Sequence, residues 1–271
     1  MKYTFIILFL TNNLLLFGQK ISGTVFEKNS NTTIEYVNIG IVGKSVGTVS
    51  DNNGKYSLQI KPEHKDDTLR VSCIGYCTYS IKVSDFLSLK NHNIGLEKRT
   101  FELQEVVVSP KKIKSKTLGV TTSLKTVICC YGDSLRGQEF GILMNNKKTA
   151  FIKTMNINVA YCNYDTVFYR INFYKVVGDL QFENILSQPV YLNISKKEIK
   201  DKITIDLSYL NLWIEGDFLV TLESIKDLGK DTFCFCASIL HSMYFRKTSQ
   251  DEWKKFGVCG ASISVEVDAE R

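Results

Sequence analysis

Three histidines and eight cysteines are the side chains of this sequence best suited to bind a metal ion. Cys234, Cys236 and His241 lie close together in the chain and could supply three ligands to zinc. Their spacing differs from the usual paired-cysteine pattern, and the residues around the two cysteines are typical of a buried strand. The other histidines, His64 and His92, lie in polar sequence far away. We therefore expect no metal site and no cofactor.

Ser134 is the candidate nucleophile, because it lies in the motif Gly-Asp-Ser-Leu at residues 132–135. The motif resembles the first block of the Gly-Asp-Ser-Leu esterases, a resemblance that implies a histidine base three residues after an aspartate near the C-terminus. The last histidine is His241, and Ser238 stands where that aspartate would be. A serine nucleophile needs an oriented base within hydrogen-bond reach. We therefore expect that the protein is not an enzyme, and an esterase that uses Ser134 is the alternative.

Asp51 begins the sequence Asp-Asn-Asn-Gly, which could be read as the start of a calcium loop. A helix-loop-helix calcium site needs more oxygen ligands and a glutamate at its twelfth position. Pro62 occupies that position here. Asp and Asn favour turns, and Gly54 can adopt a positive φ angle, so the sequence predicts a tight turn between strands.

Tyr209 and Trp213 are the candidate ligand-binding residues. Apolar residues alternate over 205–214 in a way that places both aromatic rings on the outer face. Aromatic rings beside polar groups are suited to stack on a sugar ring or to pack on a protein partner. The alternative is that a loop or the other domain covers this face. Trp253 lies between two charged residues and is expected to be partly exposed.

The N-terminal third has the pattern of short antiparallel strands. Apolar residues alternate over 21–25, 37–41 and 56–60, and clusters rich in Asn, Asp and Gly separate these runs. Alternation of period two between such turns is typical of half-buried strands. The sequence therefore predicts a small all-β domain that contains no catalytic pattern.

These runs closely resemble the carboxypeptidase-regulatory-like domain that is common in envelope proteins of the Bacteroidetes. The matching segments, in order along the chain, are 21–25, 37–39, 47–51, 54–58, 71–76 and 103–108. The resemblance implies a seven-stranded, transthyretin-like β-sandwich over residues 19–108, without a zinc site. Glu35 and Tyr36 are a departure, because they stand where the family usually has a proline.

Residues 119–271 are expected to form a second β-sandwich of jelly-roll-like type. Strand-like runs occur at 150–159, 167–174, 203–207, 216–223 and 263–267. Short strands at regular intervals, with turns between them, are typical of a sandwich. The order of the segments 136–141, 168–174, 205–208 and 216–218 resembles a companion domain found behind this module in related envelope proteins. That second resemblance implies no activity.

Residues 1–18 are similar to a secretory signal peptide, with Lys2 before a short apolar run and a small residue, Gly18, at the end. The apolar run is short and interrupted, and no later stretch is long enough to cross a membrane. We therefore expect an exported chain whose mature part has no transmembrane span. It would be periplasmic, associated with the outer membrane, or secreted.

Residues 109–118 are expected to be a basic linker, because they consist mainly of proline, serine and lysine. The four lysines of this segment contribute to a formal net charge of +6. Such a run could contact phosphate or anionic lipid headgroups, but a solvated linker is the favoured interpretation. No nucleic-acid-binding motif is present, and we expect no nucleic-acid partner.

The cysteine spacings exclude local disulfides. Cys73 and Cys77 are too far apart on an extended strand, and Cys234 and Cys236 point the same way with their Cβ atoms too far apart. Any disulfide must therefore join distant segments, and the sequence does not select the pairs. Burial of most cysteines as small apolar side chains is an equally good interpretation.

These observations predict an exported, non-catalytic protein of the cell envelope that consists of two β-sandwich domains. Its role would be binding or assembly, with an envelope protein or a glycan as partner. A purely structural or adhesive surface component is a further alternative.

Overall fold

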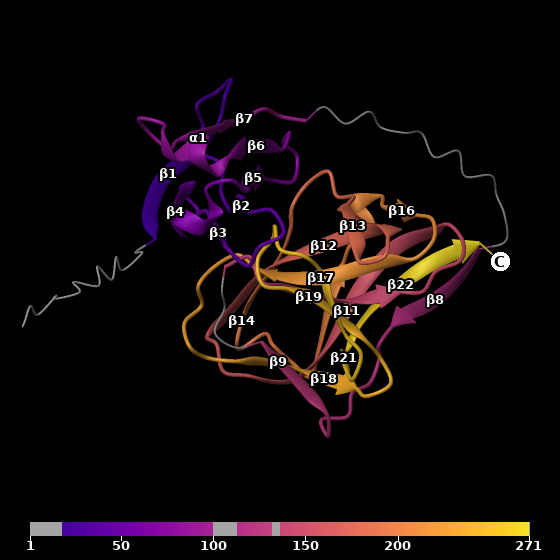
Figure 1. The fold of residues 1–271 in the computed structure, drawn as a ribbon. Helices are drawn as coiled ribbons and strands as arrows, with labels where there is room; N and C mark the ends of the chain where they lie inside the picture. Colours follow the sequence, from indigo (N-terminus) through magenta and orange to yellow (C-terminus); the bar gives the residue numbers. More distant parts are fainter. Residues whose placement is uncertain (1–17, 100–112, 132–135, 271) are drawn as a thin grey trace, which may run out of the picture.

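The computed structural model describes residues 18–99, 113–131 and 136–270, which fold into two β-sandwich domains (Figure 1). Among these residues helices are limited to α1 (Val83–Leu87), η1 (Pro62–His64) and η2 (Ser208–Leu210). None of them is long and apolar enough to cross a membrane. The expected all-β fold class is confirmed.

The first domain consists of two sheets with seven strands. The smaller sheet has the order β4 (Lys55–Ile60), β1 (Gln19–Glu27), β7 (Ile94–Leu96). The larger sheet has the order β3 (Gly47–Val49), β2 (Asn38–Ile41), β5 (Thr68–Ser72), β6 (Tyr79–Lys82). The strand number confirms the predicted seven-stranded sandwich, although the predicted closing segment 103–108 lies outside the described residues.

Apolar alternation places the core of the first domain between its sheets. On β4 the side chains of Tyr56, Leu58 and Ile60 are buried, whereas the residues between them are exposed. Full burial of one large apolar side chain contributes about 1.5–3 kcal/mol. Asp51 completes the turn before β4, since its Oδ1 accepts hydrogen bonds from the backbone N–H groups of Asn53 (2.8 Å) and Lys55 (2.9 Å). The predicted turn is therefore confirmed.

The second domain contains two larger sheets that pack face to face. The seven-stranded sheet has the order β13 (Gln181–Asn184), β12 (Thr166–Gly178), β17 (Phe218–Ser224), β10 (Glu139–Met144), β19 (Met243–Arg246), β20 (Lys254–Phe256), with β14 (Val190–Ser195) also on β12. The eight-stranded sheet has the order β21 (Gly260–Ala261), β18 (Phe233–Ser238), β11 (Ala150–Cys162), β22 (Ile263–Glu270), β8 (Ile113–Gly119), with β15 (Lys202–Asp206) and β16 (Trp213–Ile214) on β11 and β9 (Ile128–Tyr131) on β18. Apolar side chains from both sheets form one core, which confirms the predicted second sandwich.

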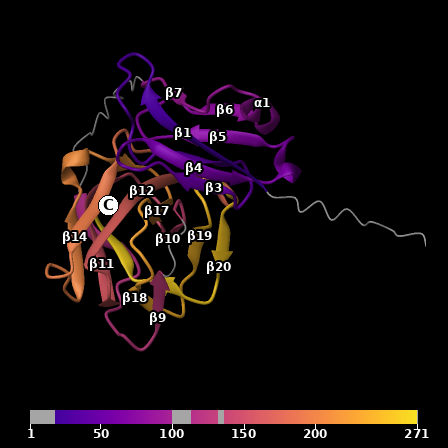
Figure 2. The ribbon, with the colours of Figure 1, turned by 90° about the vertical axis from the view of Figure 1, so that its left-hand side faces the viewer.

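A disulfide joins Cys130 on β9 to Cys234 on β18 at a sequence separation of 104 residues. The two cysteines are direct partners in the antiparallel pairing of these strands. Figure 2 shows both strands at the end of the second domain that lies away from the first domain. The prediction that any disulfide joins distant segments is confirmed.

The predicted linker 109–118 is wrong in its second half. Residues 113–118 belong to β8, which pairs antiparallel with β22 along its whole length. Lys114 is exposed, but Leu118 packs against the core and Lys116 Nζ donates to Asn146 Oδ1 (3.0 Å). β8 is an edge strand, and lysines on an edge strand discourage pairing with other chains. Lys114 and Lys116, two of the lysines that suggested a linker, therefore lie on a sheet edge.

Candidate functional site

One face of the seven-stranded sheet carries a group of polar and charged side chains. Successive residues of a strand point to opposite faces, so Arg170, Asn172 and Tyr174 on β12 lie opposite the face that joins the core. The strand register places Arg170 beside Glu223 and places Glu139 beside both Glu223 and Arg246. We call the following residues the charged cluster: Glu139, Arg170, Asn172, Tyr174, Thr221, Glu223 and Arg246.

Glu139 accepts hydrogen bonds from five groups although it is fully buried. Arg246 binds Oε2 through both Nε (2.8 Å) and Nη2 (2.6 Å). The Asn172 amide (2.8 Å), the Tyr174 hydroxyl (2.9 Å) and the Thr221 hydroxyl donate to Oε1. Bonds to a charged group are the strong ones, and they satisfy every acceptor position of this carboxylate.

Arg170 connects the charged cluster to the first domain. Its Nε and Nη2 atoms each lie 2.9 Å from a carboxylate oxygen of Glu223, which is the planar paired geometry that arginine favours. Nη1 donates to the backbone carbonyl of Tyr36 (2.8 Å), and Nη2 donates to Asn38 Oδ1 (2.8 Å). Only 2% of the Arg170 surface is exposed, so the first domain and the sheet enclose it together.

Two carboxylates face each other across β10 and β17, and the arginines compensate for their repulsion. Burial raises the pKa of Glu223, and the attraction of Arg170 opposes this effect while Glu139 adds to it. Burial alone would lower the pKa of Arg246, but Glu139, Tyr174 and Glu223 together outweigh the effect of burial and raise that pKa. Asn172 Nδ2 bridges the two carboxylates with bonds of 2.8 Å to each. The arrangement is a set of closed ion pairs, in which each carboxylate is bonded to an arginine and to Asn172.

Trp253 is buried beside this group, with 8% of its surface exposed. The guanidinium carbon of Arg246 lies 4.4 Å from the Trp253 ring centroid, and the rings of Tyr174 and Phe182 pack edge-on against it. A cation over an indole face is a favourable contact. The expectation that Trp253 is partly exposed was wrong, because the charged residues next to it turn outward while the ring turns to Arg246.

The loop before Trp253 makes the other main contacts between the domains. Gln250 accepts from the backbone N–H of Gly43 (2.9 Å) and donates to Ser72 Oγ (2.8 Å), while Ser45 Oγ donates to Asp251 Oδ2 (2.6 Å). Gly40 allows this approach, since an added Cβ would lie 3.2 Å from Gln250 and 3.0 Å from a backbone oxygen. Polar bonds and close backbone contact therefore fix the two domains to each other.

A cavity of about 390 Å³ lies between the two domains. Both domains contribute to its wall: Asn38, Arg70, Ser72, Cys73, Ile74, Gly75, Tyr76, Thr78 and Arg99 from the first, and Arg170, Asn172, Tyr174, Phe182, Glu183, Asn184, Leu186, Glu223, Arg246, Ser249 and Gln250 from the second. Most of these side chains are polar, and four are arginines. Part of the charged cluster forms its floor. This cavity is the candidate functional site.

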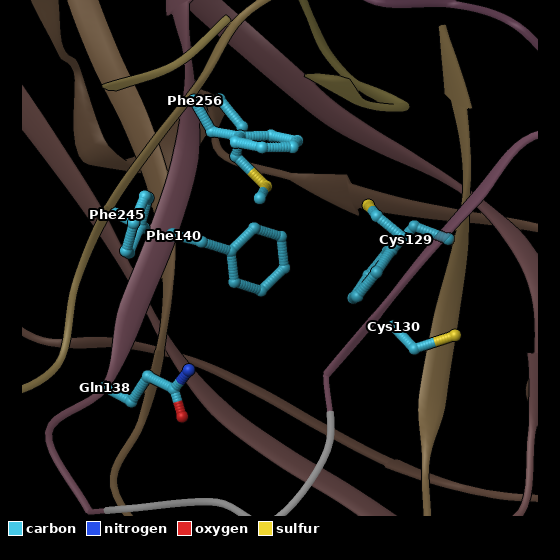
Figure 3. Close-up of a pocket in the computed structure, with 8 residues that line it drawn as sticks. Cys129, Cys130, Gln138, Phe140, Phe245 and Phe256 are labelled. Carbon is cyan, nitrogen blue, oxygen red and sulfur yellow. The ribbon is translucent and has the colours of Figure 1, made fainter. Parts of the chain in front are cut away.

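A second cavity of about 290 Å³ has the opposite chemistry. Figure 3 shows Phe140 and Phe245 on one side of it and Cys129 and Cys130 on the other. Gln138 is the one polar side chain among the described residues that line it. The cavity lies between the ends of the two sheets, beside the Cys130–Cys234 disulfide. It therefore offers mainly apolar contact to a ligand.

Tyr209 and Trp213 lie on the outer face, away from the walls of both cavities. Tyr209 is 63% exposed in η2. Trp213 is half-buried, and its ring centroid lies 5.1 Å from that of Phe151. Neither residue lines either of the two cavities, and their role in binding stays a prediction.

Ser134 lies outside the described residues, whereas the other candidate residues are placed. His241 Nδ1 lies 3.0 Å from Ser238 Oγ. Cys234 is in the disulfide, so its sulfur is not available as a zinc ligand. Among the described residues no three His, Cys, Asp or Glu side chains gather where they could hold a metal ion.

Sequence reasoning missed the charged cluster, although a signal was present. Glu139, Arg170 and Asn172 lie in the two segments, 136–141 and 168–174, that resemble a companion domain. Alternation alone assigns such polar positions to solvent. Charged residues are almost never fully buried unless they are paired, and the pairing here depends on four strands distant in sequence.

The comparisons identify the first domain. Residues 21–108, about a third of the 271-residue chain, match the family model of the CarboxypepD_reg-like domain. This part of the chain is therefore a carboxypeptidase-regulatory-like domain. Among curated proteins no relative matches.

Two solved structures show distant similarity. The cysteine protease and lectin-like domains of Cwp84, a surface layer associated protein of Clostridium difficile, are 11% identical with a TM-score of 0.41, covering 94% of this chain and 59% of that one. The infectious bursal disease virus VP2 subviral particle is 9% identical with a TM-score of 0.20, covering 93% and 64%. The chain thus spans less than two thirds of either, and at these TM-scores neither similarity supports a functional argument.

The reactivity of the cysteine thiols provides a first test of the two cavities, because Cys73 lines the larger one and Cys129 lines the smaller one. Burial raises the pKa of Cys73 to about 11 and that of Cys129 to about 12. At pH 8 a thiol with a pKa of about 11 is ionised in roughly one molecule in a thousand, and the thiolate is the reactive form. We expect iodoacetamide to label the exposed Cys77 first and the other two much more slowly, as peptide mass spectrometry would measure. Equal rates would contradict this placement.

Proposed function

We propose that this is an exported, non-catalytic protein of the cell envelope with a binding or assembly role, whose ligand is a protein or a glycan. The observation that carries the proposal is the polar cavity between the two domains, with walls from both. Ligand sites occur preferentially at domain interfaces. The two carboxylates near this cavity are held by arginines, which favours recognition over proton transfer.

The Cys130–Cys234 disulfide supports export. Disulfides persist in oxidising compartments such as the periplasm and the cell exterior, and they are rare in the cytosol. The signal-like segment at residues 1–18 points the same way. Cell fractionation with an antibody against the chain tests the location, and recovery of the protein only in the cytoplasm would contradict it.

A combined binding and activity screen tests the central proposal. The purified chain is applied to a glycan array and used to capture envelope proteins, and the same sample is treated with a fluorophosphonate probe for reactive serines. We expect a bound ligand and no labelling at Ser134. Labelling that disappears in Ser134→Ala, together with ester hydrolysis and no binding, would replace the proposal with an esterase.

Tyr209 and Trp213 form a second candidate surface, which Tyr209→Ala tests. Because the Tyr209 ring is largely exposed, we expect the free energy of unfolding to change by less than about 0.5 kcal/mol. The affinity of the Tyr209→Ala variant for the ligand should fall only if this face forms part of the ligand-binding site. Affinity is measured by titration calorimetry with whichever ligand the screen identifies, and unchanged affinity would remove Tyr209 from the site.

A further inference from the structure

Arg70 gives the cavity between the domains an unbalanced positive charge. Within the wall Arg170 pairs with Glu223, Arg246 pairs with Glu139 behind it, and Glu183 pairs with Lys175 at 2.9 Å. Arg70 is half-buried on β5, and its guanidinium has no hydrogen-bond or ion-pair partner among the described residues. A partly enclosed guanidinium favours an anionic partner, and its planar fork matches a carboxylate or a sulfate.

The rest of the wall suits a ligand with many hydroxyl groups. Amide side chains both donate and accept hydrogen bonds, and hydroxyl side chains do the same. The wall supplies both kinds: Asn38, Ser72, Thr78, Asn184, Ser249 and Gln250. Phe182 and Tyr76 add aromatic surface that could contact the apolar face of a sugar ring. The volume of about 390 Å³ lies within the usual range for small-ligand sites, roughly 300–1,000 Å³.

The strands at the cavity argue against an extended peptide as the ligand. Peptides often bind by adding a strand to an exposed sheet edge. β5, which carries Arg70 and Ser72, is paired on both sides, with β2 and β6. β12, which carries Arg170, Asn172 and Tyr174, is also paired on both sides, with β17 and with β13 and β14. Beside Arg70 and the charged cluster the cavity therefore presents side chains and no free strand edge. β13, which also contributes to the wall, is an edge strand paired only with β12.

From these features we infer that the cavity binds an acidic saccharide, with the anionic group of the sugar at Arg70 and its hydroxyl groups at the surrounding amides and hydroxyls. The inference rests on the proposed binding function and specifies the class of its ligand. The carboxylates of Glu139 and Glu223 do not contact the saccharide in this arrangement, because they are already bonded to Arg246 and Arg170.

An array of oligogalacturonates, chondroitin sulfate oligosaccharides and neutral galactan oligosaccharides tests this inference on the full chain. Oligogalacturonates carry carboxylates alone, whereas chondroitin sulfate carries both carboxylates and sulfates, so binding to the second series alone would indicate that the sulfate is the recognised group. Arg70→Gln removes the charge and keeps a polar side chain, and we expect it to fold normally because no described group bonds to the Arg70 guanidinium. Arg136→Gln is the matched control, since Arg136 is exposed and lies outside the cavity wall.

We expect binding to at least one acidic series and none to the neutral series. Arg70→Gln should weaken that binding by about tenfold or more, as for loss of a hydrogen bond to a charged group, and Arg136→Gln should not. Binding only to the neutral series, or loss of binding in Tyr209→Ala but not in Arg70→Gln, would overturn the inference while leaving the binding role intact. No ligand of any class, together with serine labelling at residue 134, would overturn the proposed function as well.

Discussion

Replacement of Arg170 by alanine is expected to lower the free energy of unfolding by about 3–5 kcal/mol, the usual cost of removing one partner of a buried ion pair. The substitution leaves the Glu223 carboxylate buried without its cation. It also removes the donor to the Tyr36 carbonyl and to Asn38, so the contact between the domains weakens at the same time. Urea unfolding followed by tryptophan fluorescence measures the change, because Trp253, one of the two tryptophans, lies beside the charged cluster.

Two further variants make this prediction specific. Lys175→Ala removes an exposed ion pair from the same strand, and we expect a loss of less than about 1 kcal/mol. Arg170→Met combined with Glu223→Leu removes both charges, so the double variant should recover part of the loss, with a coupling of about 0.5–3 kcal/mol. If Arg170→Ala were no more harmful than Lys175→Ala, the buried ion pair would not stabilise the fold.

Removal of the Cys130–Cys234 disulfide is expected to produce the second large effect, a loss of about 2–5 kcal/mol. The bridge closes a loop with a separation of 104 residues, and a long closed loop restricts the unfolded chain strongly. Alanine at both positions is the preferred change, because Cys234 is fully buried and serine would bury a hydroxyl. Urea unfolding of the double variant, with and without reducing agent, measures the loss.

The same unfolding curves reveal where this effect arises. If the disulfide acts on the unfolded chain, its removal exposes more surface on unfolding and the dependence of stability on urea becomes steeper. Cys77→Ala is the control, since Cys77 is an exposed free cysteine. A midpoint that does not respond to reducing agent in the unaltered protein would contradict the prediction.

The fold could be predicted from the sequence where one face of a strand is apolar. Tyr56, Leu58 and Ile60 alternate with polar residues, and their pattern correctly indicated which side of β4 meets the core. The first domain also carried recognisable segments, and the family match at residues 21–108 bears out that resemblance. The disulfide could be limited to distant segments because strand geometry excludes the local pairs.

The candidate site could not be predicted in the same way, because both faces of β12 are buried. One face joins the core, and the other carries Arg170, Asn172 and Tyr174 against the first domain. The pairing of these residues depends on the register of β10, β17 and β19, which local sequence does not determine. The prediction of a linker was wrong over residues 113–118 for a related reason. Lysines are common both in linkers and on protected sheet edges, so composition does not distinguish the two.

The bond from Arg170 to the Tyr36 carbonyl has an evolutionary consequence. A main-chain carbonyl is present whichever amino acid occupies a position, so drift at residue 36 does not by itself remove this acceptor. No other amino acid combines a permanent charge with donors directed to a carboxylate and a carbonyl at once, so residue 170 has no such freedom. This bond therefore requires arginine at position 170 across descendants of this gene, whereas at position 36 it places no requirement on the side chain.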